Sequence, residues 1–158
     1  MNSPHRIPFS QIVTAWIASA ITLGLAFLIF RFDHVPYVLA SLGGSCVILF
    51  GMPESVMAQP RSLIGGHVIG TVSGLMWHQL VGADPITMAA AVATAVSMMM
   101  VTNTLHSPAG ADPLIVISAG ADWRFLWQPL AIGLAVLLCG ALVYHRGILK
   151  RSYPDRWF

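Results

Sequence analysis

Apolar residues occur in six runs along the chain, separated by short stretches that carry Gly, Pro and charged residues. Crossing a bilayer as a helix takes about 20 mostly apolar residues. Four runs reach or approach that length, and they cover residues 12–30, 63–81, 86–101 and 125–144. The other two runs, 35–50 and 108–119, are shorter and contain Gly and Pro. The pattern predicts an all-α integral membrane protein that forms a single transmembrane domain over residues 1–158.

The six runs form two similar sets of three. A shift of 69 residues places Gln59-Pro60 on Gln128-Pro129 without a gap, and Val47-Ile48 on Val116-Ile117. We therefore expect two three-segment repeats, at about residues 10–74 and 79–143, each made of a long helix, a short broken helix and a long helix. The short segments either cross as half-helices joined to extended backbone, re-enter on one side, or are simply short tilted helices.

Positive charges bear on the orientation in the membrane. Residues 145–158 form a basic tail, which predicts a cytoplasmic C-terminus, and His5 and Arg6 predict the same for the N-terminus. If all six segments cross, Arg61 also lies inside, and the two repeats are inverted because three is an odd number. If the short pair is re-entrant, Arg61 falls outside. We favour the first arrangement, in a bacterial inner membrane.

Composition narrows the class of protein. Charged residues make up 9% of the chain and the mean hydropathy is +0.75, whereas soluble domains carry about a quarter charged residues. The lipid bilayer is therefore the expected surroundings. The sequence has no basic face and no motif that reads DNA or RNA, which argues against a nucleic-acid partner. Cys46 and Cys139 lie inside apolar runs, which indicates packing and not a disulfide.

A first polar stretch connects the second and third runs. Pro60 suits the first turn of a helix, where no backbone N–H is needed. Arg61 would then lie at the membrane surface, able to hold an anion, with His67 about two turns deeper. The alternatives are that Arg61 is an ordinary interfacial anchor and that His67 packs in the core. The motif residues of this stretch are Pro53, Gln59, Pro60, Arg61, Gly66 and His67.

A second polar stretch, Leu105 to Pro113, interrupts the fifth run. Its prolines, Pro108 and Pro113, prevent a continuous helix and would free backbone N–H and C=O groups. A helix that begins near Pro113 would direct its amides and the positive end of its dipole at an anion. Ser41–Ser45 is the matching stretch of the first repeat, so two facing helix starts near the midplane could form one anion site. The alternatives are a surface loop and, for His106, a helix C-cap.

Both stretches resemble the HPP family of small integral membrane proteins, named for a His-Pro-Pro motif. The family pattern His-Pro-Pro-Ala-Gly-Ala reads here His106-Ser107-Pro108-Ala109-Gly110-Ala111. The other family signature is similar to the stretch from Gly51 to His67, and the resemblance covers roughly residues 31–146. It implies a transport function, because plant and cyanobacterial members are associated with nitrite movement across plastid or cell membranes.

Two residues depart from the family pattern. Ser107 stands where the family has its first Pro, which restores a backbone donor and adds a hydroxyl. Asp112 stands where small and apolar residues are usual. Its negative charge would weaken an anion site unless the carboxyl group is paired or protonated.

These observations predict a transporter or channel for a small inorganic anion, nitrite above all, with the site where the two broken middle segments meet. Arg61 and His67 would guard the entrance, and a titrating His67 or His106 could couple a proton to the anion. The residues expected to bind the anion are Ser41, Leu42, Gly43, Gly44, Ser45, Asn103, His106, Ser107, Ala109, Gly110 and Ala111. Structural roles are expected for Pro53, Gln59, Pro60, Gly66, Pro108, Pro113, Gln128 and Pro129.

Two other functions stay open. One is a non-transporting membrane scaffold, in which Gly-rich faces pack helices together. The other is an intramembrane metal- or haem-binding protein that uses His67 and His106. We expect no enzyme, because the usual nucleophile, metalloprotease and nucleotide motifs are lacking, and we expect neither a cofactor nor a resident metal. With so few spans, a homo-oligomer is expected for either the transporter or the scaffold.

Overall fold

The computed structural model describes residues 7–30, 36–155 and 157, and for residues 36–39 it describes the backbone alone. His5 and Arg6, which oriented the N-terminus above, and Val35 at the start of the second run lie outside the described residues.

All regular structure in the described part of the chain is helical, which confirms the all-α prediction. The helices are α1 (Phe9–Phe30), α2 (Pro36–Gly51), α3 (Pro60–Leu80), α4 (Pro85–Thr102), α5 (Asp112–Ser118) and α6 (Ile132–Leu142). Tight 3-10 turns occupy Val56–Ala58, Ser107–Ala111 and Trp123–Leu126, and wider π turns at Trp127–Ala131 and Val143–Ile148 flank α6.

Local sequence explains where the long helices begin. Gln59 has extended backbone (φ −74°, ψ 148°) and Pro60 opens α3, as predicted, since a first-turn residue needs no N–H donor. α4 also begins with a proline, Pro85, and the Asp84 side chain before it accepts hydrogen bonds from the N–H groups of Ile86 and Thr87. The Asp84 cap satisfies two amides that a helix start leaves without partners.

Three helices among the described residues are long and apolar enough to cross a membrane: Phe9–Phe30, Pro85–Thr102 and Trp123–Ile148, the last of which contains α6. The sequence predicted a fourth span at 63–81. That segment does form a 21-residue helix, α3, but it is less apolar because it contains Gly, Ser, Thr and His. Many of these small and polar residues are buried inside the protein, so they face neighbouring helices and not lipid.

The two short segments differ, and α2 corrects the prediction. Residues Ser41–Ser45 lie inside an uninterrupted helix of 16 residues, so Gly43 and Gly44 do not break it. A glycine inside a helix costs only about 1 kcal/mol relative to alanine, which surrounding contacts can offset. The second short segment is broken as predicted, since the Ser107–Ala111 turn precedes a helix of 7 residues, α5. Turn and helix together extend about 20 Å, less than the hydrocarbon core of about 30 Å.

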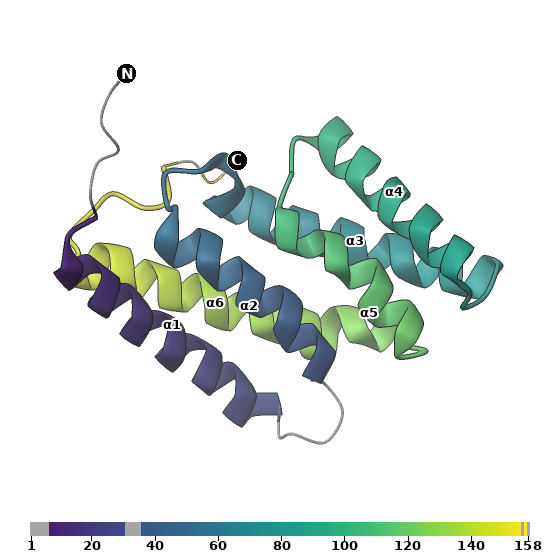
Figure 1. Cartoon of the computed structure of the whole chain (residues 1–158), viewed down its shortest axis with the longest axis horizontal. Coiled ribbons are helices and arrows are strands. Elements are labelled where there is room, and N and C mark those ends of the chain that lie inside the picture. The colour runs from purple at the N-terminus through teal and green to yellow at the C-terminus, as the bar shows by residue number, and fades with distance from the viewer. Residues whose placement is uncertain (1–6, 31–35, 156, 158) are drawn as a thin grey trace.

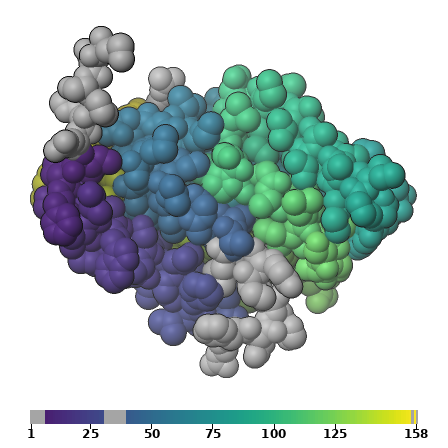
Figure 2. All heavy atoms as spheres, viewed as in Figure 1, coloured from purple at the N-terminus to yellow at the C-terminus, as the bar shows by residue number. Residues whose placement is uncertain are grey.

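The helices pack as two halves, which Figure 1 shows side by side. α1, α2 and α6 form one half, and α3, α4 and α5 form the other. The third helix of each predicted repeat therefore packs on the first two segments of the other repeat. Each half has its own apolar core, around Leu42 and Leu137 in the first and around Leu75 and Val116 in the second. The halves meet where α2 contacts the Ser107–Ala111 turn and α5, seen in Figure 2 where blue atoms adjoin green ones.

One end of the molecule collects both ends of the described chain. A side-chain nitrogen of Arg151 in the tail lies 3.2 Å from Oε1 of Gln11, at the start of α1, and another lies 3.8 Å from Glu54 in the α2–α3 connection. Arg61, at the start of α3, donates to the carbonyl of Thr102, at the end of α4, over 2.8 Å. The starts of α1 and α3, the end of α4 and the basic tail thus share this end.

Candidate functional site

Four buried side chains from different segments form one hydrogen-bonded chain, which we call the buried histidine cluster: Ser45, His67, His106 and Asp112. The Ser45 hydroxyl oxygen lies 2.8 Å from Nε2 of His67 and 2.9 Å from Nε2 of His106. On its other side, Nδ1 of His67 lies 2.6 Å from the Asp112 carboxylate. All four side chains are at most 2% exposed. The cluster joins α2, α3, α5 and the turn before α5 at the junction of the two halves.

Glycines on α3 and α2 let these segments approach closely. A Cβ atom on Gly66 would lie 2.7 Å from Cβ of His106 and 3.0 Å from the Thr104 carbonyl, so no side chain fits there. On α2, a Cβ on Gly44 would lie 3.1 Å from Pro108. The close approach brings the rings of His67 and His106 to a centroid distance of 5.0 Å. Glycine at these positions therefore positions the histidines, which is the role small residues play between membrane helices.

Hydrogen-bond partners constrain each imidazole. Nδ1 of His106 lies 2.8 Å from the carbonyl oxygen of Met57, and a carbonyl only accepts, so this nitrogen carries a hydrogen. The Ser45 hydroxyl also lies 3.0 Å from the Ser41 carbonyl one turn earlier in α2. Asp112 is paired with His67. The sequence indicated that a carboxyl group here would weaken an anion site unless it was paired or protonated, and this pairing fulfils that requirement. Ionisable groups buried in a membrane domain are costly unless paired, and they commonly mark functional sites.

Three of the predicted site residues meet in the cluster: Ser45, His67 and His106. Ser45 takes part through its hydroxyl, because its backbone lies inside the continuous α2 helix. His67 was predicted to guard the entrance, but it is fully buried at the centre of the cluster. Ser41 borders the cluster through its carbonyl. Ala109, also fully buried, lies against Gly70 of α3.

Other predicted residues do not take part in the described hydrogen bonds of the cluster. Asn103 is exposed and ends α4 in a left-handed conformation with φ 54°, which makes it a helix cap. Ser107 is exposed, and Leu42 packs in the apolar core beside Gly133. Arg61 is also exposed, at the end of the molecule that carries the tail. Gly43, Gly110 and Ala111 are partly buried.

The predicted structural motif residues border the helix starts and the connections. Gln59 donates to the carbonyl of Pro53 over 3.0 Å, which closes the α2–α3 connection just before Pro60. Gln128 has non-helical backbone (φ −141°, ψ 107°), and Pro129 follows it in the turn that leads into α6. Pro113 is buried in the first turn of α5, where α3 approaches it at Gly74. Each Gln-Pro pair thus precedes the third helix of its predicted repeat.

Sequence reasoning did not assign two members of the network. Asp112 was noted only as a departure from the family pattern, and the Met57 carbonyl was not considered. An acidic residue inside an apolar run was the available signal for Asp112, because such a residue requires a partner. The carbonyl of Met57 left no signal, since any residue has one.

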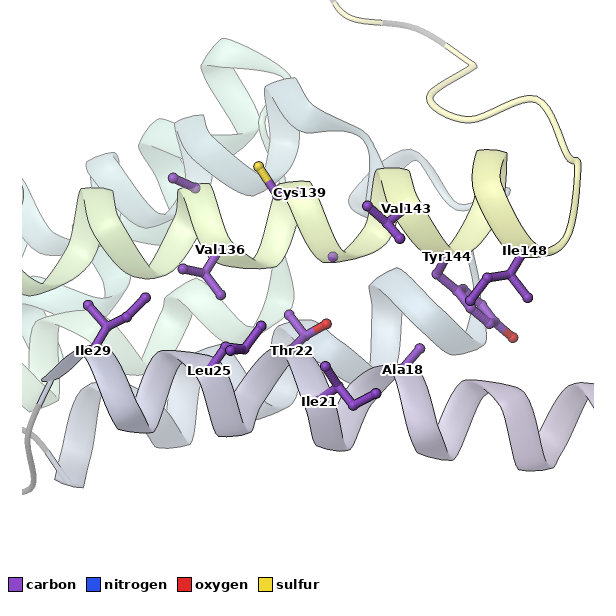
Figure 3. A pocket seen from close by; sticks show the side chains of 12 residues that line it. Ala18, Ile21, Thr22, Leu25, Ile29, Val136, Cys139, Val143, Tyr144 and Ile148 are labelled. Atoms are coloured by element: carbon purple, nitrogen blue, oxygen red, sulfur yellow. The ribbon is translucent and has the colours of Figure 1, made fainter.

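Two apolar grooves of the described protein are lined by none of the four cluster residues. One, of about 450 Å³, runs between α1 and α6, and Figure 3 shows the side chains that line it, among them Ile21, Leu25 and Val136. Another, of about 760 Å³, is lined by residues of α3 and α4, such as Met76 and Met98. Their apolar lining suits acyl chains or neighbouring helices and does not suit a small ion.

The fold and its buried polar junction define a small polytopic membrane protein, and comparison with known proteins agrees. Residues 4–154 match the family described as "HPP, transmembrane region". The chain belongs to the HPP family, as its motifs indicated.

Two relatives, both transmembrane proteins of Dictyostelium discoideum, are similar in sequence. One is 35% identical over 99% of this chain and 54% of its own length, and the other is 38% identical over 77% of this chain and 45% of its own length. This chain therefore spans about half the length of these relatives. No solved structure matches the chain.

Proposed function

We propose that this protein moves a small inorganic anion, nitrite above all, across a membrane, through the junction between the two halves. The observation that carries the proposal is the Ser45 hydroxyl of α2 held between two buried imidazoles, His67 and His106. If one of these O–H or N–H groups exchanges its protein partner for an anion, it replaces part of the hydration shell of that anion. Substrate sites of many transporters lie in this way at the interface of repeats near the bilayer midplane. The substrate itself is suggested by the family resemblance.

An inverted repeat is part of the proposal. Contacts at the tail end of the molecule bring the start of α1 and the end of α4 to the same end, which supports opposite directions for the first helices of the two repeats. The exchange of third helices between the halves also supports two related units. The basic tail and Arg61 share that end, which supports a cytoplasmic location for both under the positive-inside rule. A bacterial inner membrane stays our proposed location, although both relatives named above are eukaryotic.

The other candidate functions make different demands on the cluster. A metal or haem iron would need a free imidazole nitrogen, whereas all four ring nitrogens of His67 and His106 have protein partners. A scaffold would need glycine faces directed at another chain. Gly66 and Gly70 instead face His106 and Ala109 of the same chain. The partners of the imidazoles favour transport over a metal site. Gly43 and Gly110 have no described atom within 4 Å of an added Cβ, so these two positions leave room for a second chain, and a homo-oligomer is compatible with transport.

The test is nitrite uptake into proteoliposomes that contain the purified full chain. Ser45→Ala removes the bridging hydroxyl, and Ser97→Ala is the matched control, because Ser97 is exposed on α4 and its hydroxyl donates to the carbonyl of Ala93 in the same helix. We expect saturable uptake by the wild type and Ser97→Ala, and loss of uptake in Ser45→Ala. Uptake by the wild type equal to that of empty vesicles would reject nitrite as the substrate.

A further inference from the structure

We infer that the buried histidine cluster is a proton relay, in which the Ser45 hydroxyl passes a proton between His67 and His106 and turns toward Ser41 when a second proton is bound. The inference deepens the proposed function, because it names the ion that would accompany the anion. It rests on that function only for the identity of the anion. The relay itself follows from counting hydrogens in the contacts of the cluster.

The two outer contacts each require one hydrogen. The carbonyl oxygen of Met57 accepts, so the hydrogen between it and His106 sits on Nδ1 of the ring. Between Nδ1 of His67 and the Asp112 carboxyl group, 2.6 Å apart, one hydrogen is also needed. Without it, a nitrogen lone pair would face a carboxylate oxygen. That hydrogen can belong to the imidazole or to the carboxyl group, and the number of hydrogens in the cluster is the same in either case.

The inner contacts require more hydrogens than neutral rings provide. The Ser45 hydroxyl has a single hydrogen, yet Nε2 of both rings lies within 2.9 Å of its oxygen. The Ser41 carbonyl, 3.0 Å away, is a third partner for the same hydrogen, although as a carbonyl inside α2 it also accepts a helical N–H. Wherever the hydroxyl hydrogen points, at least one bare Nε2 atom would face an oxygen lone pair. At least one Nε2 therefore carries a hydrogen. The cluster then holds one proton beyond an ionised carboxylate and two neutral imidazoles, which makes its net charge zero. A neutral cluster is the form an apolar interior favours.

This proton can occupy two positions. In the first, His67 Nε2–H donates to Ser45, and the Ser45 O–H donates to Nε2 of His106. In the second, both bonds are reversed. The step between them breaks the N–H bond on His67 and the O–H bond of Ser45, while a new O–H bond forms on Ser45 and a new N–H bond forms on His106. One proton leaves one ring and one arrives at the other, and the serine is unchanged.

A second proton has a defined place. When both Nε2 atoms carry hydrogens, both donate to the Ser45 oxygen, and the hydroxyl hydrogen turns to the Ser41 carbonyl, 3.0 Å away. Every contact of the cluster is then satisfied, and the net charge is +1. A monovalent anion beside the cluster would neutralise this charge. Proton and anion would therefore bind together, and their joint movement would be electroneutral.

The other described titratable side chains on the segments around the cluster lie outside its hydrogen-bonded chain. On α2, Cys46 follows Ser45 and belongs to the apolar core. On α3, Arg61 is exposed and bonds to the end of α4, and His78 lies near the opposite end of the helix. α4 and the Val56–Ala58 turn carry no titratable side chain. From the other half, His145 bonds to the carbonyl of Leu49, one turn beyond Ser45 on α2. Asp112 is therefore the carboxyl group that balances the charge of the rings.

The test is ¹⁵N nuclear magnetic resonance of the full chain with labelled histidine, in lipid nanodiscs, across a pH titration. Loss of signals in His67→Gln and His106→Gln assigns the rings. In the wild type near neutral pH we expect a hydrogen on Nδ1 of His106 and one hydrogen shared across the two Nε2 positions. Acidification should then protonate the remaining Nε2 and shift the signals of both rings together. In Ser45→Ala this joint shift should be lost, while Ser97→Ala should behave as the wild type.

Two results would overturn the relay. One is a wild type in which both Nε2 atoms are bare near neutral pH. The other is a joint titration of the two rings that Ser45→Ala leaves unchanged. Neither of these two NMR measurements requires anion flux, so both are independent of the nitrite uptake experiment. A cluster that titrates as expected in a protein without nitrite flux would keep the relay and reject the substrate.

Discussion

α3 and α6 are the third helices of the two predicted repeats, yet they use glycine in different ways. On α3, Gly66 and Gly70 lie against main-chain and Cβ atoms of the segment from Thr104 to Asp112. Gly74 lies against the main chain of Pro113 and Cγ2 of Val116, and Gly65 lies against the side chain of Thr104. On α6, Gly133 and Gly140 lie against the side chains of Leu42 and Thr22. Main chain cannot turn away as a side-chain tip can. The α3 half is therefore held at fixed distances, and it is the half that contributes His67, His106 and Asp112.

The α3–α4–α5 half therefore has a rigid, polar packing surface at the cluster, whereas the packing inside the α1–α2–α6 half is apolar and can adjust. The α1–α2–α6 half contributes a single member to the cluster, Ser45, which reaches across the interface. Its own core is apolar, around Leu49, Leu134 and Leu137. Two repeats with similar long and short segments thus differ in side-chain chemistry, because one half supplies most of the polar cluster and the other is apolar. The following predictions test that contrast from the largest expected effect to the smallest.

The largest effect should come from removing the buried carboxyl group. Asp112→Ala leaves Nδ1 of His67 without a partner in an apolar interior, and breaking a buried pair costs about 3–5 kcal/mol. We expect that loss in the free energy of unfolding, measured by denaturant titration in detergent. Asp122→Ala is the control, because Asp122 is exposed and only caps a short turn. Equal losses in the two variants would contradict the buried pairing.

The next effect concerns the close contacts of α3. A methyl group on Gly70 would collide with the carbonyl oxygen of Ala109, so Gly70→Ala should lower the free energy of unfolding by about 1–3 kcal/mol. Gly110→Ala is the matched control, because nothing lies within 4 Å of a Cβ at Gly110. Thermal unfolding of both variants in the same detergent measures the difference. A Gly70→Ala variant as stable as the control would show that the junction is not closely packed.

A smaller effect is expected in the apolar half. A methyl group on Gly140 would meet Oγ1 and Cγ2 of Thr22, which a rotation about χ1 can redirect, whereas Cβ of Thr22 at 3.0 Å stays in place. Gly140→Ala should therefore destabilise the protein less than Gly70→Ala, which meets a main-chain carbonyl. The double variant Gly140→Ala with Thr22→Ala should recover most of the loss. If Gly140→Ala is as damaging as Gly70→Ala and is not rescued, the two halves do not differ in the way we describe.

The smallest effect concerns the tail that covers the α2–α3 connection. The Tyr153 hydroxyl donates to the carbonyl of Ala58 over 2.7 Å, so Tyr153→Phe should cost about 1 kcal/mol. Burial raises the pKa of Tyr153 from 10.0 to about 12. Since the folded protein favours the protonated phenol, this stabilisation is complete below pH 10 and is lost as the pH rises toward 12. Alkaline thermal unfolding should show a steeper decline for the wild type than for Tyr153→Phe.

The elements could be predicted from the sequence to a large extent. Runs of apolar residues gave the long helices, and Pro60 correctly predicted the start of α3 because proline suits a first helical turn. The break near Pro108 and Pro113 was confirmed for the same steric reason. The break expected at Gly43-Gly44 was wrong. Glycine permits a break but does not force one, and neighbouring helices keep α2 intact.

The site could be predicted only in part. His67 was selected because a polar residue in a membrane segment is costly, and His106 because it lies in the Pro-containing stretch that resembles the family motif. Neither argument needs a structure. The contact between the two histidines depends on how α3 approaches the turn after α4, at Gly66, and periodicity along the chain does not contain that information. Ser45 was selected for its backbone, whereas its hydroxyl makes the contacts. Side-chain networks between distant segments depend on packing, which a single sequence does not specify.

The most direct test compares nitrite uptake by two histidine variants, one from each half. His106 and His145 are both buried, and each contacts a backbone carbonyl, that of Met57 and that of Leu49. Uptake should be measured in proteoliposomes at equal amounts of folded, reconstituted protein. Our account predicts that His106→Gln loses nitrite uptake while His145→Gln keeps it. Uptake that survives in His106→Gln, or that falls equally in both variants, would contradict a transport site at the buried histidine cluster.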